Sequence, residues 1–279
     1  MIGNVVAAIT GAAVPPQSYY LAASTNSGAS YAYDCAVDSS LNTYITGVTT
    51  DAGTVYTYVS KYDSTFTNSW KRRLNTGTNN IGSRIGLDSS GNAYIAFSYQ
   101  IGGLYVGGVA KYNSSGTIQW QRKVTPATQQ VRFFNIAVSS SGDVLVIGDH
   151  TDNGDANLFL LKYNSSGTLQ WQRDWSPTYG SNANAVAVDS TGNVYVAGYS
   201  NPTGSLNVGY IMKFNSSGTK QWHRTLTGSA TTTLEGIAVN DSNVYFCGRT
   251  FTTDYTCVVG KYNSSGTILL VGHLDKMSC

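Results

Sequence analysis

The sequence predicts an all-β fold of five four-stranded blades, each about 50 residues long. Two sets of near-identical segments carry this prediction. One begins at a lysine that returns with spacings of 50, 51, 51 and 48 residues, at Lys61, Lys111, Lys162, Lys213 and Lys261. The other resembles "AVDSTGNVYVAG", and its turn residue lies 21 to 24 residues before each lysine. A sheet that repeats at such a period needs neighbouring sheets to bury its faces, so we expect a β-propeller.

Residues 183–226 are the cleanest copy of the repeat. Four short runs rich in β-branched and aromatic residues, "NAVAV", "NVYVAGY", "VGYIMKF" and "TKQWHRTL", predict four strands. "DSTGN" joins the first pair and "NSSG" the last pair. Glycine supplies the positive φ of a tight hairpin, and Asp, Asn and Ser bond the turn backbone. We therefore interpret the N-S-S triplets as turns, although they also match a glycosylation sequon.

The amino-acid composition supports the β assignment and limits the classes of partner that we expect. Charged residues make up 11% of the chain, against roughly 25% in ordinary domains, and the net charge is +2. So weak a charge gives no field to draw the chain to nucleic acid. No stretch approaches the roughly 18 apolar residues of a membrane span. We expect no nucleic-acid partner, no membrane span and no cofactor.

The repeats resemble those of bacterial seven-bladed-type β-propellers, whose pattern is close to "AKYDSSGNLLWSR…GIAVDSSGNVYVTG". The resemblance covers roughly residues 30–270. It implies the fold far more than a function, because propellers host enzymes, lectins and scaffolds alike.

The predicted organisation has three parts: an apolar N-terminal tail at 1–17, a propeller at 18–273 and a C-terminal tail at 274–279. Residues 18–24, "SYYLAAS", occupy the slot of a fourth strand, and we expect them to pair with the outer edge of the last blade. The tail has no blade partner for its apolar side chains. We expect it to dock on a partner protein, with folding back over the propeller's own channel or edge as the alternative.

Two rows of large side chains recur after the lysines. The interpretation that we favour is packing between blades, with sugar-stacking tryptophans as the alternative. The rows are Trp70, Trp120, Trp171, Trp222 and Arg72, Arg122, Arg173, Arg224.

The two ends of the blades differ in sequence. One end carries the short repeated turns, whereas the other carries loops that vary from blade to blade, where binding residues are most often found. The ligand-binding candidates there are Tyr99, Tyr105, His150, Tyr179, Tyr199 and Phe251. Asp149, Asp152 and Asp155 give a weak alternative of a calcium site, but they lack the order of a known loop, so we expect no metal.

Four cysteines, Cys35, Cys247, Cys257 and Cys279, are too few and too uneven for a disulfide framework. We expect buried free thiols, with a cross-strand disulfide between Cys247 and Cys257 as the alternative.

Catalysis lacks its usual residues. A glycosidase needs two carboxyl groups at a set separation, yet the chain has one Glu and uses several Asp in turns. The three histidines, His150, His223 and His273, lie in unrelated contexts, without a GxSxG or HExxH motif. The sequence therefore predicts a protein that is not an enzyme.

The opening "MIGNVVAAITGAAVPPQ" has no basic region and so is not a convincing secretion signal. It resembles the openings of some marine bacteriophage virion proteins. The leading hypothesis is a non-enzymatic structural or adhesion protein on a phage tail or capsid, at the virion surface. It would recognise the host through surface glycan, or contact other virion proteins through the N-terminal tail. The alternative is a secreted, lectin-like bacterial propeller that binds glycan outside the cell.

Overall fold

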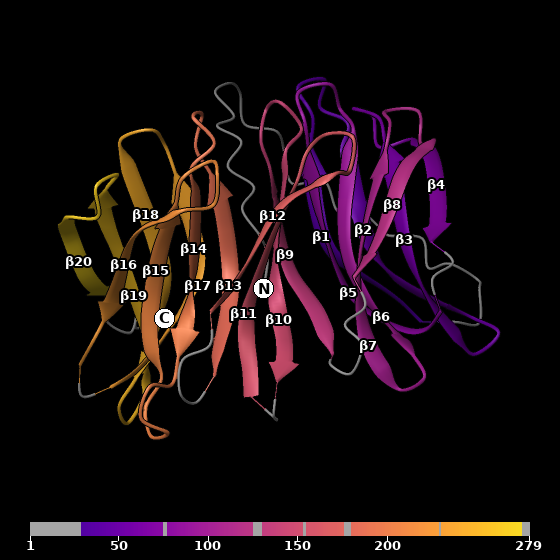
Figure 1. Ribbon diagram of the computed structural model, residues 1–279. Helices are drawn as coiled ribbons and strands as arrows, with labels where there is room; N and C mark the ends of the chain where they lie inside the picture. The colour runs from indigo at the N-terminus through magenta and orange to yellow at the C-terminus, as the bar shows by residue number, and fades with distance from the viewer. Residues whose placement is uncertain are drawn as a thin grey trace, which may run out of the picture.

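The computed structural model describes residues 29–74, 77–124, 130–152, 155–175, 180–228 and 230–274. These residues form twenty strands in five sheets, each a four-stranded antiparallel meander (Figure 1). We call the sheets blades 1 to 5 in chain order. The predicted all-β propeller of four-stranded repeats is confirmed.

The blades have the following strands. Blade 1 holds β1 (Ser30–Val37), β2 (Thr43–Asp51), β3 (Thr54–Tyr62) and β4 (Asn68–Leu74). Blade 2 holds β5 (Thr78–Leu87), β6 (Ala93–Ile101), β7 (Leu104–Tyr112) and β8 (Ile118–Val124). Blade 3 holds β9 (Val131–Val138), β10 (Val144–Asp152), β11 (Asp155–Tyr163) and β12 (Leu169–Trp175). Blade 4 holds β13 (Ser181–Val188), β14 (Val194–Ser200), β15 (Val208–Phe214) and β16 (Lys220–Leu226). Blade 5 holds β17 (Thr231–Val239), β18 (Asn243–Phe251), β19 (Tyr255–Asn263) and β20 (Ile268–Leu274).

The repeated turns are held by their own side chains. In blade 2, the amide of Gly116 donates to the carbonyl oxygen of Asn113 at 2.9 Å. The side-chain oxygen of Asn113 accepts from the amide of Thr117 at 2.8 Å. Asp88 has the same role in the turn between β5 and β6, where it accepts from the amide of Asn92 at 3.0 Å. Hairpin chemistry therefore accounts for these repeated letters.

The hydrophobic core lies between blades. Four clusters of buried residues each join one blade to the next, from blades 1 and 2 to blades 4 and 5. Side chains on both faces of an internal blade take part: Tyr94 packs toward blade 3 and Ile95 toward blade 1. Each sheet thus depends on its neighbours, as expected for propeller repeats.

The row of blades has two exposed ends. Blade 5 and blade 1 lie at opposite ends of the row in Figure 1. Tyr44, Tyr94 and Tyr195 are fully buried by the blade that follows them, whereas Tyr245, at the same place in blade 5, is 41% exposed. The predicted closure by residues 18–24 and the predicted N-terminal tail fall outside the described residues and stay predictions. Of the predicted C-terminal tail, Leu274 belongs to β20 and residues 275–279 fall outside the described residues.

The expected burial of the cysteines is wrong. Cys35, Cys247 and Cys257 are exposed free thiols, while Cys279 lies outside the described residues. In β18 and β19, Cys247 pairs with Val259 and Cys257 with Arg249, so the two thiols are not directly opposite. All three lie in the end blades, where no further blade covers them. Within the described part of the chain, no helix is long and apolar enough to cross a membrane.

Candidate functional site

Each blade is fastened to the next by the repeated tryptophan. Its indole N–H donates to the first Ser carbonyl of the next blade's NSSG turn, over 3.0 to 3.1 Å. The repeated lysine reaches the same carbonyl over 3.0 to 3.3 Å. The four tryptophan pairs are Trp70–Ser114, Trp120–Ser165, Trp171–Ser216 and Trp222–Ser264.

The repeated arginine completes the junction, which we call the interblade lock. In each pair of blades its Nε donates to the carbonyl of the turn glycine, as Arg72 does to Gly116 at 2.8 Å. Its guanidinium lies 5.4 to 5.7 Å from the centre of the tryptophan ring, within reach of a cation–π contact. The tryptophan and arginine rows therefore make contacts between blades.

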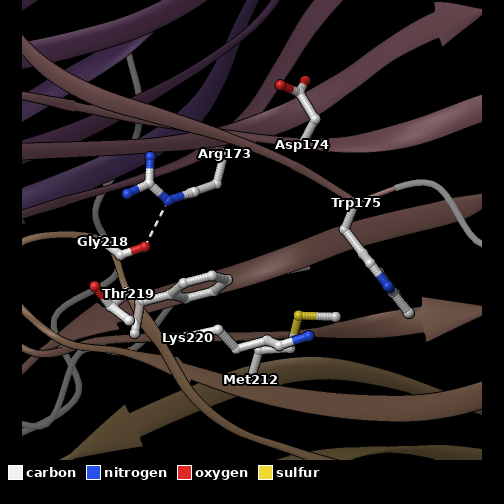
Figure 2. Close-up of a pocket in the computed structure, with 8 residues that line it drawn as sticks. Arg173, Asp174, Trp175, Met212, Gly218, Thr219 and Lys220 are labelled. Atoms are coloured by element: carbon white, nitrogen blue, oxygen red, sulfur yellow. Dashed lines mark hydrogen bonds between the residues drawn. The ribbon is translucent and has the colours of Figure 1, made fainter.

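A groove opens beside the lock of blades 3 and 4, with a volume of about 370 Å³. Figure 2 shows its lining side chains, which come from β12, β15, the turn before β16 and the first residue of β16. They are Arg173, Asp174, Trp175, Met212, Phe214, Gly218, Thr219 and Lys220. A groove of about 410 Å³ occupies the same place between blades 1 and 2. The groove is thus a product of the repeat, and its lining differs from junction to junction.

Two positions set the groove of blades 3 and 4 apart. Trp175 stands where blades 1, 2 and 4 have Leu74, Val124 and Leu226. Lys220 stands where the other junctions have Ile118, Leu169 and Ile268. An aromatic ring and an amine therefore replace two aliphatic side chains at this junction alone among the four described.

Trp175 is half-buried and held edge-on. Its ring centre lies 4.9 Å from that of Tyr210 and 5.2 Å from that of His223. Burial, with the nearby charges of Lys220 and Arg224, lowers the pKa of His223. The neutral imidazole is thus favoured beside the indole, so Lys220 and Arg173 supply the positive charge of the groove.

The carboxylate of Asp174 points away from the other lining side chains (Figure 2). It lies 3.0 Å from Nε2 of His150, on the opposite face of blade 3. The side chains that line this groove therefore present cationic and aromatic groups, with the acid turned outward.

The predicted ligand-binding residues do not gather at one place. Tyr99 is 3% exposed and stacks on Phe97 at 5.8 Å, so it presents no free ring. The hydroxyl of Tyr199 accepts from Asn182 at 3.0 Å. Tyr105 is half-buried at the start of β7.

The other three candidate ligand-binding residues lie apart from one another in the sequence and make different contacts. His150 pairs with Asp174, as above. Phe251 is exposed and packs on Tyr255 in blade 5, with ring centres 4.8 Å apart. Tyr179 lies outside the described residues.

The carboxylate of Asp149, one of the three aspartates of the calcium alternative, is bonded to an arginine. Its fully buried carboxylate accepts from Nε of Arg132 at 3.1 Å and from Nη2 at 2.5 Å. This bonding raises the pKa of Arg132. In the part of the chain that the structure describes, no group of three or more His, Cys, Asp or Glu side chains is placed to hold a metal ion. The side chains of Asp152 and Asp155 are outside that part.

Sequence reasoning missed Trp175 and Lys220, although the signal was present. Both are departures from a repeat whose other copies agree in character. Trp175 is also the one tryptophan of the five in the chain that falls outside the repeated row. Aligning the blades and looking for the letters that break the repeat would have found both.

Comparisons with known proteins agree on the fold. The SBBP family, described as a beta-propeller repeat, matches residues 176–203. No curated protein matches the chain. The chain is a β-propeller repeat protein.

Solved structures resemble the chain at low identity. A protein of unknown function from Dyadobacter fermentans is 11% identical with a TM-score of 0.57, over 85% of this chain and 80% of that one. The β-propeller domain of the Trilobed protease from Pyrococcus furiosus is 9% identical with a TM-score of 0.53, over 88% and 70%. A polysaccharide lyase of family PL25 is 12% identical with a TM-score of 0.52, over 86% and 68%. The chain spans 55% of a eukaryotic initiation factor that it also resembles.

Proposed function

We propose that this protein is a non-enzymatic binding propeller that takes an acidic glycan in the groove between blades 3 and 4. One observation carries the proposal. At this junction Trp175 and Lys220 replace the aliphatic residues that the repeat has elsewhere, beside the guanidinium of Arg173. The repeat does not require these two residues, since the other junctions form with aliphatic side chains, so they are positions at which a function particular to this junction can be expressed.

The chemistry of the groove suits a sugar that carries carboxylate or sulfate. An indole packs on the apolar face of a sugar ring, and such aromatic contacts combine an apolar body with a polar edge. The terminal nitrogens of Arg173 each bond one backbone carbonyl and retain an N–H for a ligand. Lys220 adds an ammonium, and Thr219 adds a hydroxyl. A cationic groove with its acid turned outward favours an anionic ligand over a neutral one.

Binding without cleavage follows from the same lining. Glycoside hydrolysis needs a pair of carboxyl groups across the bond that breaks. Asp174 is the one acid among the lining residues, and its carboxylate points out of the groove (Figure 2). Since a polysaccharide lyase and other enzymes share the fold, the non-enzymatic assignment rests on this groove and not on the architecture.

The setting that we propose is the surface of a phage tail or capsid, where the propeller would contact host glycan or other virion proteins. What supports it is the resemblance of the opening "MIGNVV" to phage virion proteins, together with exposed, repetitive Ser-, Asn- and Thr-rich turns. The alternative setting is a secreted lectin-like protein. Five blades, without a sixth, are part of this proposal.

A glycan array followed by titration calorimetry tests the binding. We expect the chain to select uronate-containing or sulfated glycans, and Trp175→Ala to weaken the best of them by about tenfold or more, since one aromatic contact accounts for that much affinity. Leu226→Ala, at the same place in blade 4, is the matched control and should leave affinity unchanged. Equal affinity in both variants, or cleavage of the bound glycan, would overturn the proposal.

A further inference from the structure

The outer faces of blades 1 and 5 lack the interblade lock. Each of the two faces has lost a different side of it. Blade 5 has Leu270 where the other blades have the lock tryptophan, and Gly272 where they have the lock arginine. Blade 1 has Phe66 where the other four turns have the glycine that receives the tryptophan. The residues at the tryptophan and arginine positions are therefore smaller in blade 5, and the residue at the turn-glycine position is larger in blade 1.

The glycine of a locked turn has no room for a side chain. A Cβ at Gly116 would lie 2.6 Å from the ring of Trp70, and the other three turns are the same within 0.2 Å. Phe66 keeps this turn conformation, with φ of 63° and the same amide bond to the first turn residue. A blade with a tryptophan cannot pack on blade 1 in the way that the internal blades pack.

Phe66 fills the tryptophan's place from its own blade. Its ring stacks on Tyr62 at 5.4 Å between centres. At the locked junction of blades 1 and 2, Trp70 stacks on Tyr112, the residue that corresponds to Tyr62, at 6.2 Å. An aromatic ring thus covers the tyrosine in both blades. Tyr112 is covered by a tryptophan of the preceding blade, whereas Tyr62 is covered by Phe66 of its own blade.

A second residue with positive φ lies in the turn between β1 and β2 of the same blade. Leu41 has φ of 64° at a turn position that is glycine in blades 2, 3 and 4. Leu41 and Phe66 are 68% and 65% exposed. A large apolar residue with positive φ costs free energy in the folded chain, so two exposed residues of this kind in the turns of blade 1 point to a function for these turns. Leu41 and Phe66 are thus two exposed apolar side chains of blade 1.

The outer face of blade 5 has smaller residues at the lock positions, with open space beside them. Leu270 leaves space that an indole fills in the other blades, and a Cβ at Gly272 would meet nothing within 4 Å. On this face the side chains of Tyr245 and Leu270 are 41% and 64% exposed. Lys261 keeps the lock position, 5.2 Å from the ring centre of Tyr245, as Lys213 lies over Tyr195. The other lock lysines bond a Ser carbonyl, whereas Lys261 has no such partner among the described residues.

We propose that the outer face of blade 5 binds the outer face of blade 1 of a second copy of this chain. Phe66 would enter the space beside Leu270, and Lys261 would donate to the carbonyl of Ser64, the counterpart of Ser114. The surface continues an interface that the chain already makes four times, with the bulky residue moved to the other partner. The two faces lie at opposite ends of the row (Figure 1), so copies would join head to tail. Such an interface repeats until the copies close a ring or form a filament.

Sedimentation velocity of the full chain over a wide concentration range tests the proposal. We expect reversible association, weakened by about tenfold or more in Phe66→Gly, which leaves a cavity, and in Leu270→Trp, which makes a clash. Phe66→Gly restores the glycine of the other turns, so the variant should fold. A chain that stays monomeric at every concentration would overturn the proposal, as would association that both variants leave unchanged.

A mixing experiment separates contact between copies from contact within one chain. Equal amounts of the two single variants should associate again, because the tryptophan introduced in one variant would meet the glycine introduced in the other, while the native Leu270 and Phe66 meet at the remaining junction. Covering of either face by the chain's own residues 18–24, or closure of one chain on itself, would leave the mixture no better than the separate variants. That result would overturn the assignment to a second copy.

Discussion

The indole N–H of Trp171 donates to the carbonyl oxygen of Ser216 at 3.0 Å, across the junction of blades 3 and 4. The residues are 45 positions apart, and the same bond recurs at the other three junctions. The NSSG turn therefore has two functions: it closes its own hairpin, and it offers a backbone carbonyl to the preceding blade. The side-chain bonds of the hairpin, together with the close approach of the tryptophan to the turn glycine, explain why the turn is repeated almost letter for letter.

Replacing a turn glycine should separate the two functions. In Gly116→Ala the new Cβ meets the ring of Trp70 and the residue must keep a positive φ, so we expect a loss of about 2–4 kcal/mol in the free energy of unfolding. Gly53→Ala has the same φ penalty but nothing within 4 Å, so it should lose about 1 kcal/mol. Urea unfolding followed by tyrosine and tryptophan fluorescence measures both, and equal losses would contradict a role for the lock.

The repeat made most of the fold predictable. Fixed letters such as Asn113 and Asp88 mark the turns, and the alternation of the segments between them gives the strands. The partner of Trp171 was not predictable, because it is a backbone carbonyl and any residue has one. The open ends were hidden for a related reason: Leu270 and Phe66 look like single substitutions until the blades are stacked and each is seen to remove half of one contact.

The candidate site was less predictable than the fold. Variable loops drew attention to Tyr99 and Tyr199, yet Tyr99 is buried and Tyr199 is bonded to Asn182. A loop's variability says that it is free to change, but not which side chains face solvent. Trp175 and Lys220 break the pattern of aligned blades, and a comparison of repeats within the one chain would have selected them.

The pair of Arg132 and the buried Asp149 should contribute more to stability than a fully exposed pair. Asp149→Ala would leave the guanidinium of Arg132 without its fork partner, and because that side chain is 36% exposed, the loss should be about 2 kcal/mol, below the cost of a fully buried pair. Asp51→Ala removes the partner of Arg73 from an exposed pair, where roughly 1 kcal/mol or less is expected. Thermal unfolding of the two variants compares them, and similar melting temperatures would show that the burial of Asp149 has no energetic consequence.

Acid should destabilise the protein through the turn aspartates. Burial alone would raise the pKa of Asp88, but hydrogen bonds from Asn92, Tyr94 and Ser90 outweigh it and lower that pKa. Asp38 and Asp189 behave alike. Because the unfolded chain then binds more protons than the folded one, the contribution of these groups is present above about pH 4 and is lost as the pH falls below it. The urea midpoint should therefore drop between pH 5 and pH 3, roughly the range around an ordinary Asp pKa.

Asp34 gives the control of opposite sign. Burial is the largest influence on its carboxyl and raises the pKa, even though the carboxylate accepts from the amide of Ile85 at 3.0 Å. Its protonation therefore favours the folded state as the pH falls, and Asp34→Asn, which cannot take up this proton, should show a slightly steeper acid loss than the parent. Asp88→Asn removes a group with a lowered pKa, so its acid loss should be shallower. If the two variants changed the pH dependence in the same direction, the opposed electrostatics of these two carboxyl groups would be wrong.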